Sequence, residues 1–191
     1  ALFAAQQLAD KLKNALTYSA GSAAGANREL SYLRETSRSL GLDFSSAAQA
    51  YAKFAAATKC SGISAAQTRT VFEGIAAASS KLGLSADETQ GALLALSQMA
   101  SKGTVQAEEL RGQLGERLPG ALKIAAQAMG VTQAELGKMM ETGQLIASDF
   151  LPKFGAALKN EFGGSVNSLT MEINRLNSSW DVWKQNFSNA D

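Results

Sequence analysis

Residues 81–88, KLGLSADE, contain the pattern that organises this chain. Gly83 favours the left-handed conformation that ends a helix, and Ser85 is a residue type that caps the start of the next one. Glu88 follows three residues later, so that Ser85 and Glu88 complete a capping box. The same order of glycine, aliphatic residue and capping residue occurs at Gly41-Leu42-Asp43, Gly62-Ile63-Ser64, Gly83-Leu84-Ser85 and Gly130-Val131-Thr132. Further capping boxes are expected for Ser64 with Gln67 and for Thr132 with Glu135.

The spacing of these boundaries predicts an array of antiparallel helices. Gly41, Gly62, Gly83 and Gly103 recur at a spacing of about 21 residues, which is one helix and a short turn in each unit. Two units give a helix-pair period of about 42 residues, which aligns Leu42, Phe54 and Ile63 with Leu84, Leu96 and Val105. We therefore expect an all-α chain of helix hairpins, either an irregular bundle or a short α-solenoid.

The composition agrees with closely packed helices and excludes several kinds of site. Alanine supplies 35 of the 191 residues, whereas aromatic residues make up only 7%. The 18 basic and 17 acidic residues form no basic run that would indicate nucleic-acid binding. With one cysteine and no histidine, Cys/His metal sites and a Cys–His dyad are excluded, so Cys60 is expected to be a buried structural thiol. We predict no cofactor, no catalytic residue and no transmembrane helix.

A second pattern interrupts the helical array between Gly103 and Gly120, GTVQAEELRGQLGERLPG. Pro119 should turn the chain near Leu118 and allow a helix from Pro119 to Met129. Near-neighbour ion pairs are expected among Glu108, Glu109, Arg111, Glu116 and Arg117, and a close approach of another backbone at Gly112, Gly115 and Gly120. The candidate elbow or docking residues are Glu109, Arg111, Gly115, Glu116, Arg117 and Pro119.

This segment resembles the N-terminal conserved region of phage and prophage tail tape measure proteins. The resemblance is most specific over Gly103 to Gly120, extends through Ser97 to Thr132, and is looser from Leu40 to Phe154, where DFLPKF at Asp149–Phe154 matches a weaker family element. It implies a structural tail component that sets tail length and organises tail tube assembly. The implied partners are the tail tube protein, tail assembly chaperones and tail tip or baseplate proteins. Proteins of this family are much longer, lie in the tail lumen of the virion and are made in the host cytoplasm, so the chain would be a fragment.

The two ends of the chain have a different pattern from its middle. The C-terminal part carries an unbroken heptad seam, which predicts a long helix that pairs with another helix or folds back on the domain. The candidate interaction seam comprises Phe162, Val166, Leu169, Ile173, Leu176, Trp180, Trp183 and Phe187. At the N-terminus, Leu2, Ala5, Ala9, Leu12 and Leu16 keep a similar alternation before the small-residue segment Tyr18–Asn27. We expect three parts: an N-terminal helix and hinge over 1–27, a helical-hairpin domain over 28–163, and a heptad helix over 164–191 that supports self-association of the full-length protein.

Three other classes of function remain compatible with these residues. A helical-repeat adaptor unrelated to tails would use the same helix boundaries, and stable monomers that bind a cellular protein would favour it. A membrane-active helical domain would use alanine-rich amphipathic helices, and leakage of vesicles would reveal it. A cell-wall hydrolase is the enzymatic alternative, which cleavage of peptidoglycan would reveal.

Overall fold

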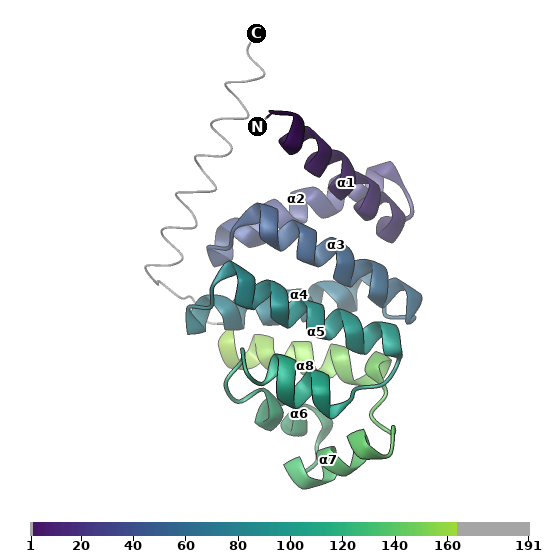
Figure 1. The fold of residues 1–191 in the computed structure, drawn as a ribbon, viewed down its shortest axis with the longest axis vertical. Coiled ribbons are helices and arrows are strands. Elements are labelled where there is room, and N and C mark those ends of the chain that lie inside the picture. The colour runs from purple at the N-terminus through teal and green to yellow at the C-terminus, as the bar shows by residue number, and fades with distance from the viewer. Residues whose placement is uncertain (1, 164–191) are drawn as a thin grey trace.

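The computed structural model describes residues 2–163, and this part of the chain folds as helices joined by short turns (Figure 1). The all-α prediction is confirmed. Between the described residues no strand forms, and the only β-type pairing there is an isolated antiparallel bridge between Thr104 and Ile146. The helices are α1 (Leu2–Ala20), α2 (Ala23–Leu40), α3 (Phe44–Cys60), α4 (Ala65–Leu82), α5 (Ala86–Lys102), the π-helix η1 (Glu108–Leu114), α6 (Ala121–Met129), α7 (Gln133–Glu141) and α8 (Ala147–Phe162).

The glycine and capping residues end and begin the helices where the sequence predicts. Gly41, Gly83 and Gly130 adopt the left-handed conformation directly after α2, α4 and α6. All three predicted capping boxes form, with both reciprocal hydrogen bonds present at Ser64 and Gln67, Ser85 and Glu88, and Thr132 and Glu135. Residues within one turn of each boundary therefore determine where these helices begin and end.

The capping box of α5 allows a direct test of this local control. Replacing Ser85 with Ala removes the hydroxyl that accepts a hydrogen bond from the Glu88 N–H. We expect the free energy of unfolding to fall by about 1 kcal/mol in chemical denaturation. The exposed Ser101→Ala substitution in the same helix, which changes no cap, should alter it by less than about 0.5 kcal/mol. Equal losses at both positions would contradict a capping role for Ser85.

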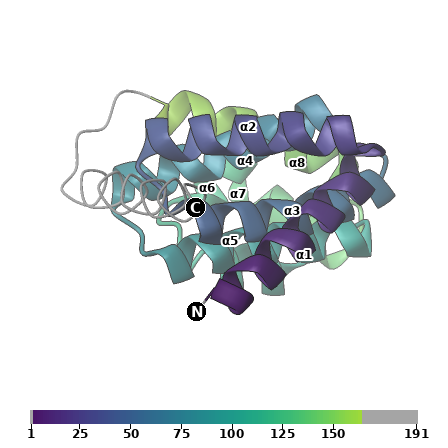
Figure 2. The same cartoon turned by 90° about the horizontal axis from the view of Figure 1, so that it is seen from above.

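The long helices pack in two layers (Figure 2). One layer contains α1, α3 and α5, and the other contains α2, α4 and α8; α3 packs against both α1 and α5, and α4 packs most extensively against α8. Consecutive helices alternate between the layers as far as α5, which is the arrangement of a short α-solenoid. The η1 and α6 segments continue the stack beyond α5 and α8, and α7 lies at the far end from α1 (Figure 1).

Neighbouring helices within a layer run in the same direction with a nearly constant register. The Lys59 ammonium donates to the Tyr18 carbonyl at 2.6 Å, joining residues 41 positions apart in α1 and α3. Arg69 of α4 binds Glu29 of α2, 40 positions earlier, and the Ser61 hydroxyl after α3 donates to the Ala100 carbonyl of α5, 39 positions later. These separations agree with the helix-pair period that the glycine spacing predicts.

The closest helix contact lies between α4 and α8, at two glycines. A Cβ placed on Gly155 would lie 2.5 Å from the Cα of Val71, and one on Gly74 would clash with the carbonyl oxygen of Gly155. The sequence predicts such an approach at Gly112, Gly115 and Gly120, and this prediction is wrong. No atom comes within 4 Å of a Cβ at Gly112 or Gly120, and Gly115 faces the carbonyl of its own turn.

Helix α6 starts two residues later than predicted. The chain does leave the helix near Leu118, but Pro119 is not the first helical residue because Gly120 adopts φ = 82°. A left-handed residue cannot belong to a right-handed helix, so α6 begins at Ala121. The segment from Gly115 to Gly120 is a turn.

Cys60 is exposed, which corrects the prediction of a buried thiol. It is the last residue of α3, and its sulfur lies 3.8 Å from the hydroxyl of Tyr18, which is itself 59% exposed. Free cysteine is usually buried, but Cys60 stands at the end of a helix, which lies at the edge of the layer.

At the N-terminus, the segment Tyr18–Asn27 is mostly helical, and only Gly21 and Ser22 separate α1 from α2. Leu16 is fully buried in the same core as the later helices. The division of the chain at residues 27 and 163 stays a prediction. The heptad segment 164–191 lies outside the described residues.

Candidate assembly site at the signature segment

The signature segment, residues 103–120, contains the short π-helix η1 and packs into the core through three leucines. Leu110, Leu114 and Leu118 are fully buried and stand four residues apart. A π-helix has wider turns than an α-helix, with i→i+5 hydrogen bonds, so residues four apart stay nearly in line. This spacing lets Leu110 and Leu114 form one apolar edge of η1, which contacts α5 and α6, and Leu118 follows in the turn after η1.

Glu109 is buried, whereas the sequence placed it in a solvent-exposed group of ion pairs. Only 1% of Glu109 is exposed, and one of its carboxylate oxygens, Oε1, binds the ammonium of Lys102 at the end of α5. This hydrogen bond raises the pKa of the Lys102 ammonium. Within residues 2–163, the other oxygen, Oε2, has no hydrogen-bond partner. The described ion pairs therefore include no near-neighbour pair of the expected kind within the segment.

The two arginines of the segment lie across glycines of other helices. The guanidinium of Arg117 covers Gly91 of α5, where a Cβ would clash with Nε, and its Nη1 donates to the Gln113 carbonyl at 2.5 Å. Arg111 covers Gly137 of α7, where a Cβ would lie 2.5 Å from Nη2. Both arginines thus hold the segment to its neighbours.

The remaining elbow candidates face the solvent. Glu116 and Pro119 are exposed, Gly115 is half-buried, and Arg111 stays exposed although it covers Gly137. Of the six residues, Glu109 and Arg117 are engaged inside the protein. Any docking surface on this segment is therefore formed by the exposed edge at Arg111, Glu116 and Pro119.

Two backbone hydrogen bonds close the segment at its base. The N–H of Val105 donates to the Leu145 carbonyl at 2.8 Å, and the N–H of Ala147 donates to the Gly103 carbonyl at 2.9 Å. We call residues 103–105 and 145–147, which pair in this way, the clasp. The clasp brings together the end of α5 and the start of α8, which are separated by the whole signature segment, α6 and α7.

Of the candidate seam at the C-terminus, Phe162 lies within the described residues. This side chain is half-buried at the end of α8, and the Lys81 ammonium lies 6.0 Å from its ring centroid. Val166, Leu169, Ile173, Leu176, Trp180, Trp183 and Phe187 lie outside the described residues.

A buried polar network was missed by the sequence analysis. The Tyr51 hydroxyl donates to Oε2 of Glu29 at 2.6 Å, and Nη2 of Arg69 donates to Oε1 at 2.5 Å, so that α2, α3 and α4 meet at one carboxylate. Glu29 falls on the apolar face of α2, between Ala26 and Leu33, and this position was the signal that could have identified it.

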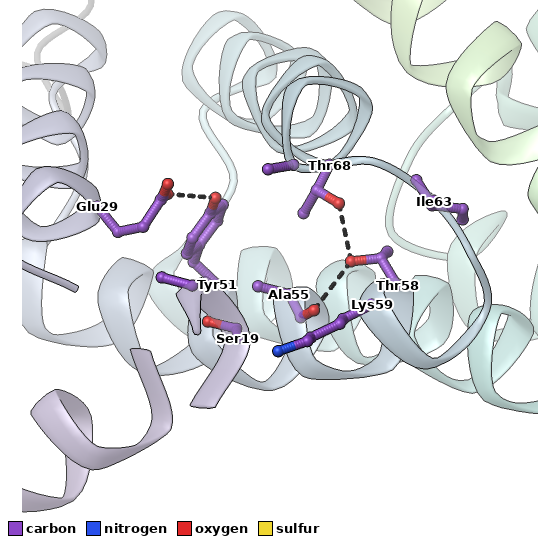
Figure 3. A pocket seen from close by; sticks show the side chains of 10 residues that line it. Ser19, Glu29, Tyr51, Ala55, Thr58, Lys59, Ile63 and Thr68 are labelled. Atoms are coloured by element: carbon purple, nitrogen blue, oxygen red, sulfur yellow. Dashed lines mark hydrogen bonds between the residues drawn. The ribbon is translucent and has the colours of Figure 1, made fainter. Parts of the chain in front are cut away.

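These helices and the end of α1 surround a small cavity (Figure 3). Its volume is about 80 Å³, and Figure 3 shows the hydrogen bond from Thr68 to Thr58 on one side and that from Tyr51 to Glu29 on the other. Ligand pockets usually measure about 300–1,000 Å³. The cavity is too small for such a ligand, so we assign these residues to the packing of the layers.

The network gives the protein a defined response to high pH. Burial raises the pKa of Tyr51, and the hydrogen bond to Glu29 raises it further; the pKa of Tyr32 is raised in the same direction by burial. The unfolded phenol ionises near pH 10, so this stability is complete below about pH 10 and is lost as the pH rises.

We expect Tyr51→Phe to be less stable than the parent at pH 8, where it lacks the hydrogen bond to Glu29. Above about pH 10 the difference should shrink by up to about 1.4 kcal/mol per pH unit, because the variant has no phenol to ionise on unfolding. Urea denaturation from pH 8 to 11 measures this difference. A gap that stays constant across the range would contradict the buried, protonated state of Tyr51.

Comparison with known proteins places the whole chain in one family. The family model described as "Tape measure protein" matches residues 2–189. A curated "Probable tape measure protein" of Salmonella phage Felix O1 is 38% identical over 76 residues, which cover 36% of this chain and 10% of that protein. The chain therefore matches about a tenth of the length of that relative. No solved structure matches. The match over nearly every residue shows that the chain belongs to the tape measure protein family.

Proposed function

We propose that residues 41–154 form a compact anchor or assembly domain of a phage tape measure protein, and that the length of the tail is measured by sequence outside this chain. The family is one of structural tail proteins. The full-length protein then sets tail length and organises tail tube assembly inside the virion tail, after synthesis in the bacterial cytoplasm.

The folding back of the helices carries this proposal. A single helix of 114 residues, the number from 41 to 154, would span about 170 Å at 1.5 Å per residue. The longest described helix has 19 residues and spans about 29 Å. The chain reverses direction at each boundary from α2 to α5. Further residues in this region would therefore add helices to the stack and would not lengthen a single rod.

The proposed partners follow from the family and from the exposed edge of the signature segment. The tail tube protein, the assembly chaperones and the tail tip or baseplate proteins are the partners we assign to the full-length protein. Arg111, Glu116 and Pro119 supply the exposed charged and apolar groups that one of them would contact. Self-association of the full-length protein is assigned to the seam from Phe162 to Phe187.

Deletion of residues 41–154 from the full-length protein tests the proposal by electron microscopy of tails. We expect assembly to fail. The matched control removes 114 residues from a helical stretch outside this chain, which should give intact tails shortened by about 170 Å. If deletion of residues 41–154 also gives intact tails shortened by that amount, this region is part of the ruler and the proposal is wrong.

The two-layer array also supports a second candidate, a helical-repeat interaction module whose partner is not a tail protein. Parallel neighbours at a constant helix-pair period are typical of such modules. Purification from infected or induced cells separates the candidates, since the tail component should remain with assembled tails. Among residues 2–163, the helices are too short or too polar to cross a membrane.

A further inference from the structure

The register of α8 departs from that of the other helices by one whole period. Neighbours within a layer touch at separations of 39 to 41 residues elsewhere in the array. Helix α8 instead meets α4 through Val71 and Gly155, 84 residues apart, and through Glu73 and Lys159, 86 residues apart. It therefore lies where the helix-pair period would place a helix one repeat earlier in the sequence. Residues 104–146 fill that additional repeat.

The ends of this additional repeat are joined by the clasp, where the side chains of Val105 and Leu145 are also buried in the core. The two backbone bonds at Val105 and Ala147 and the bridge between Thr104 and Ile146 join its base. Gly103, at φ = 76°, is the turn from which the segment leaves α5. In Figure 1 the chain continues the stack beyond α5 through α6 and α7, and then returns as α8 beside α4.

The segment has internal contacts of its own and covers a face of α5 that carries small or polar side chains. Arg111 of η1 joins it to α7 at Gly137. On α5 it meets Gly91 through Arg117 and Lys102 through Glu109. The helical period places Ala95 and Gln98 on the same line between these two contacts.

The buried carboxylate favours release of the segment. Oε2 of Glu109 has no hydrogen-bond partner among the described residues, and a buried charged oxygen without one is costly. On opening, that oxygen would regain water, and the ammonium of Lys102, already 43% exposed, would exchange its contacts with Glu109 and Gln106 for water. The closed state is thus held by the leucines and the clasp against an opposing electrostatic contribution.

We infer that residues 104–146 form a cap that is hinged at the clasp and opens as one body, while the two-layer array of α2 to α5 stays folded. Opening uncovers the line from Gly91 to Lys102 on α5 and the side of α8 that packs on α6. The inference concerns the motion of this chain and goes beyond the proposed anchor function, since its test needs no tail assembly.

Hydrogen exchange measured by mass spectrometry on the whole chain tests the cap, with Ala147→Pro as the main variant. Proline removes the N–H that binds Gly103, yet it is well accepted at the first position of a helix, where Ala147 stands. We expect amides within 106–144 to exchange about fivefold faster as a group, with those of α2 to α4 unchanged. Ala86→Pro, at the equivalent first position of α5, should leave both groups unchanged.

A second variant keeps the test decisive if a proline at the buried Ala147 prevents folding. Lys102→Gln removes the cation that binds Glu109 and should accelerate the same amides, whereas Lys138→Gln, an exposed lysine of α7, should not. Acceleration spread equally over α2 to α4, or no group acceleration within 106–144 in any folded variant, would overturn the cap. Neither result depends on whether the domain anchors a tail.

Discussion

Gly155→Ala is expected to lower the free energy of unfolding by about 3 kcal/mol. The new Cβ would lie 2.5 Å from the Cα and 3.0 Å from the backbone nitrogen of Val71, whereas carbon atoms in contact prefer about 3.5–4.0 Å. A clash with a flexible side chain could be relieved by a rotamer change, but here both atoms belong to the backbone of α4. Helices α4 and α8 must therefore separate, which loosens the largest helix contact in the array.

The matched control for this change is Gly112→Ala, at a glycine where no atom lies within 4 Å of the new Cβ. Because alanine restricts the unfolded chain more than glycine does, we expect Gly112→Ala to be neutral or to stabilise the protein by roughly 0.5–1 kcal/mol. Chemical denaturation of both variants gives the comparison. Similar losses at the two positions would mean that α4 and α8 do not pack as closely as described.

Arg69→Met is expected to destabilise the protein by about 2 kcal/mol. Methionine keeps much of the aliphatic volume of arginine but leaves the Glu29 carboxylate with Tyr51 as its remaining donor. The side chain of Glu29 is 11% exposed, so an uncompensated charge there is costly. The full loss for a buried pair, about 3–5 kcal/mol, is reduced because the Arg69 side chain is 36% exposed and water screens the change.

A double-mutant cycle separates this electrostatic contribution from lost packing. In the Arg69→Met background, Glu29→Gln replaces the charge with an amide oxygen that still accepts from Tyr51, and it should recover most of the loss. As a surface comparison, Lys153→Met removes the exposed pair with Asp149 and should cost less than about 0.5 kcal/mol. Strictly additive effects of Glu29→Gln and Arg69→Met would show that the two side chains are not coupled.

The sequence was sufficient for features that depend on a few adjacent residues. The boundaries at Gly41, Gly83 and Gly130 could be predicted because a left-handed glycine and a capping side chain act within one turn. The capping boxes at Ser64, Ser85 and Thr132 follow for the same reason. The helix-pair period was visible because these local boundaries recur at regular spacing.

The features that the sequence could not supply depend on distant partners. No local pattern shows that α8 returns beside α4, and so the close approach at Gly74 and Gly155 was assigned to the wrong glycines. Glu109 looked like a surface residue because its neighbours in sequence are charged, whereas its burial depends on Lys102 and the π-helical turn. The sequence predicts that α6 starts at Pro119, but the left-handed conformation of Gly120 delays its start to Ala121.

The elbow residues illustrate the same division within the candidate site. The segment could be identified from its glycines, proline and charges, and its failure to continue as an ordinary helix was predictable. The sequence could not show which of its charged groups face inward, because Arg117 and Arg111 pack against glycines of α5 and α7 that are distant in the sequence. Only the structure separates the exposed residues Glu116 and Pro119 from the buried Glu109.

The return of α8 to α4 also determines the order in which the chain can fold. The contacts of α3 with α1 and α5 join residues about 40 positions apart, but one flank of α4 must wait for residues 84 positions further along. During synthesis, the surface around Val71 and Gly74 stays unpaired until α8 has emerged, and long loop closures of this kind slow folding. A nascent chain that stops before Ala147 therefore presents an apolar helix flank to the cell, which makes it a substrate for chaperones and a source of misassembly.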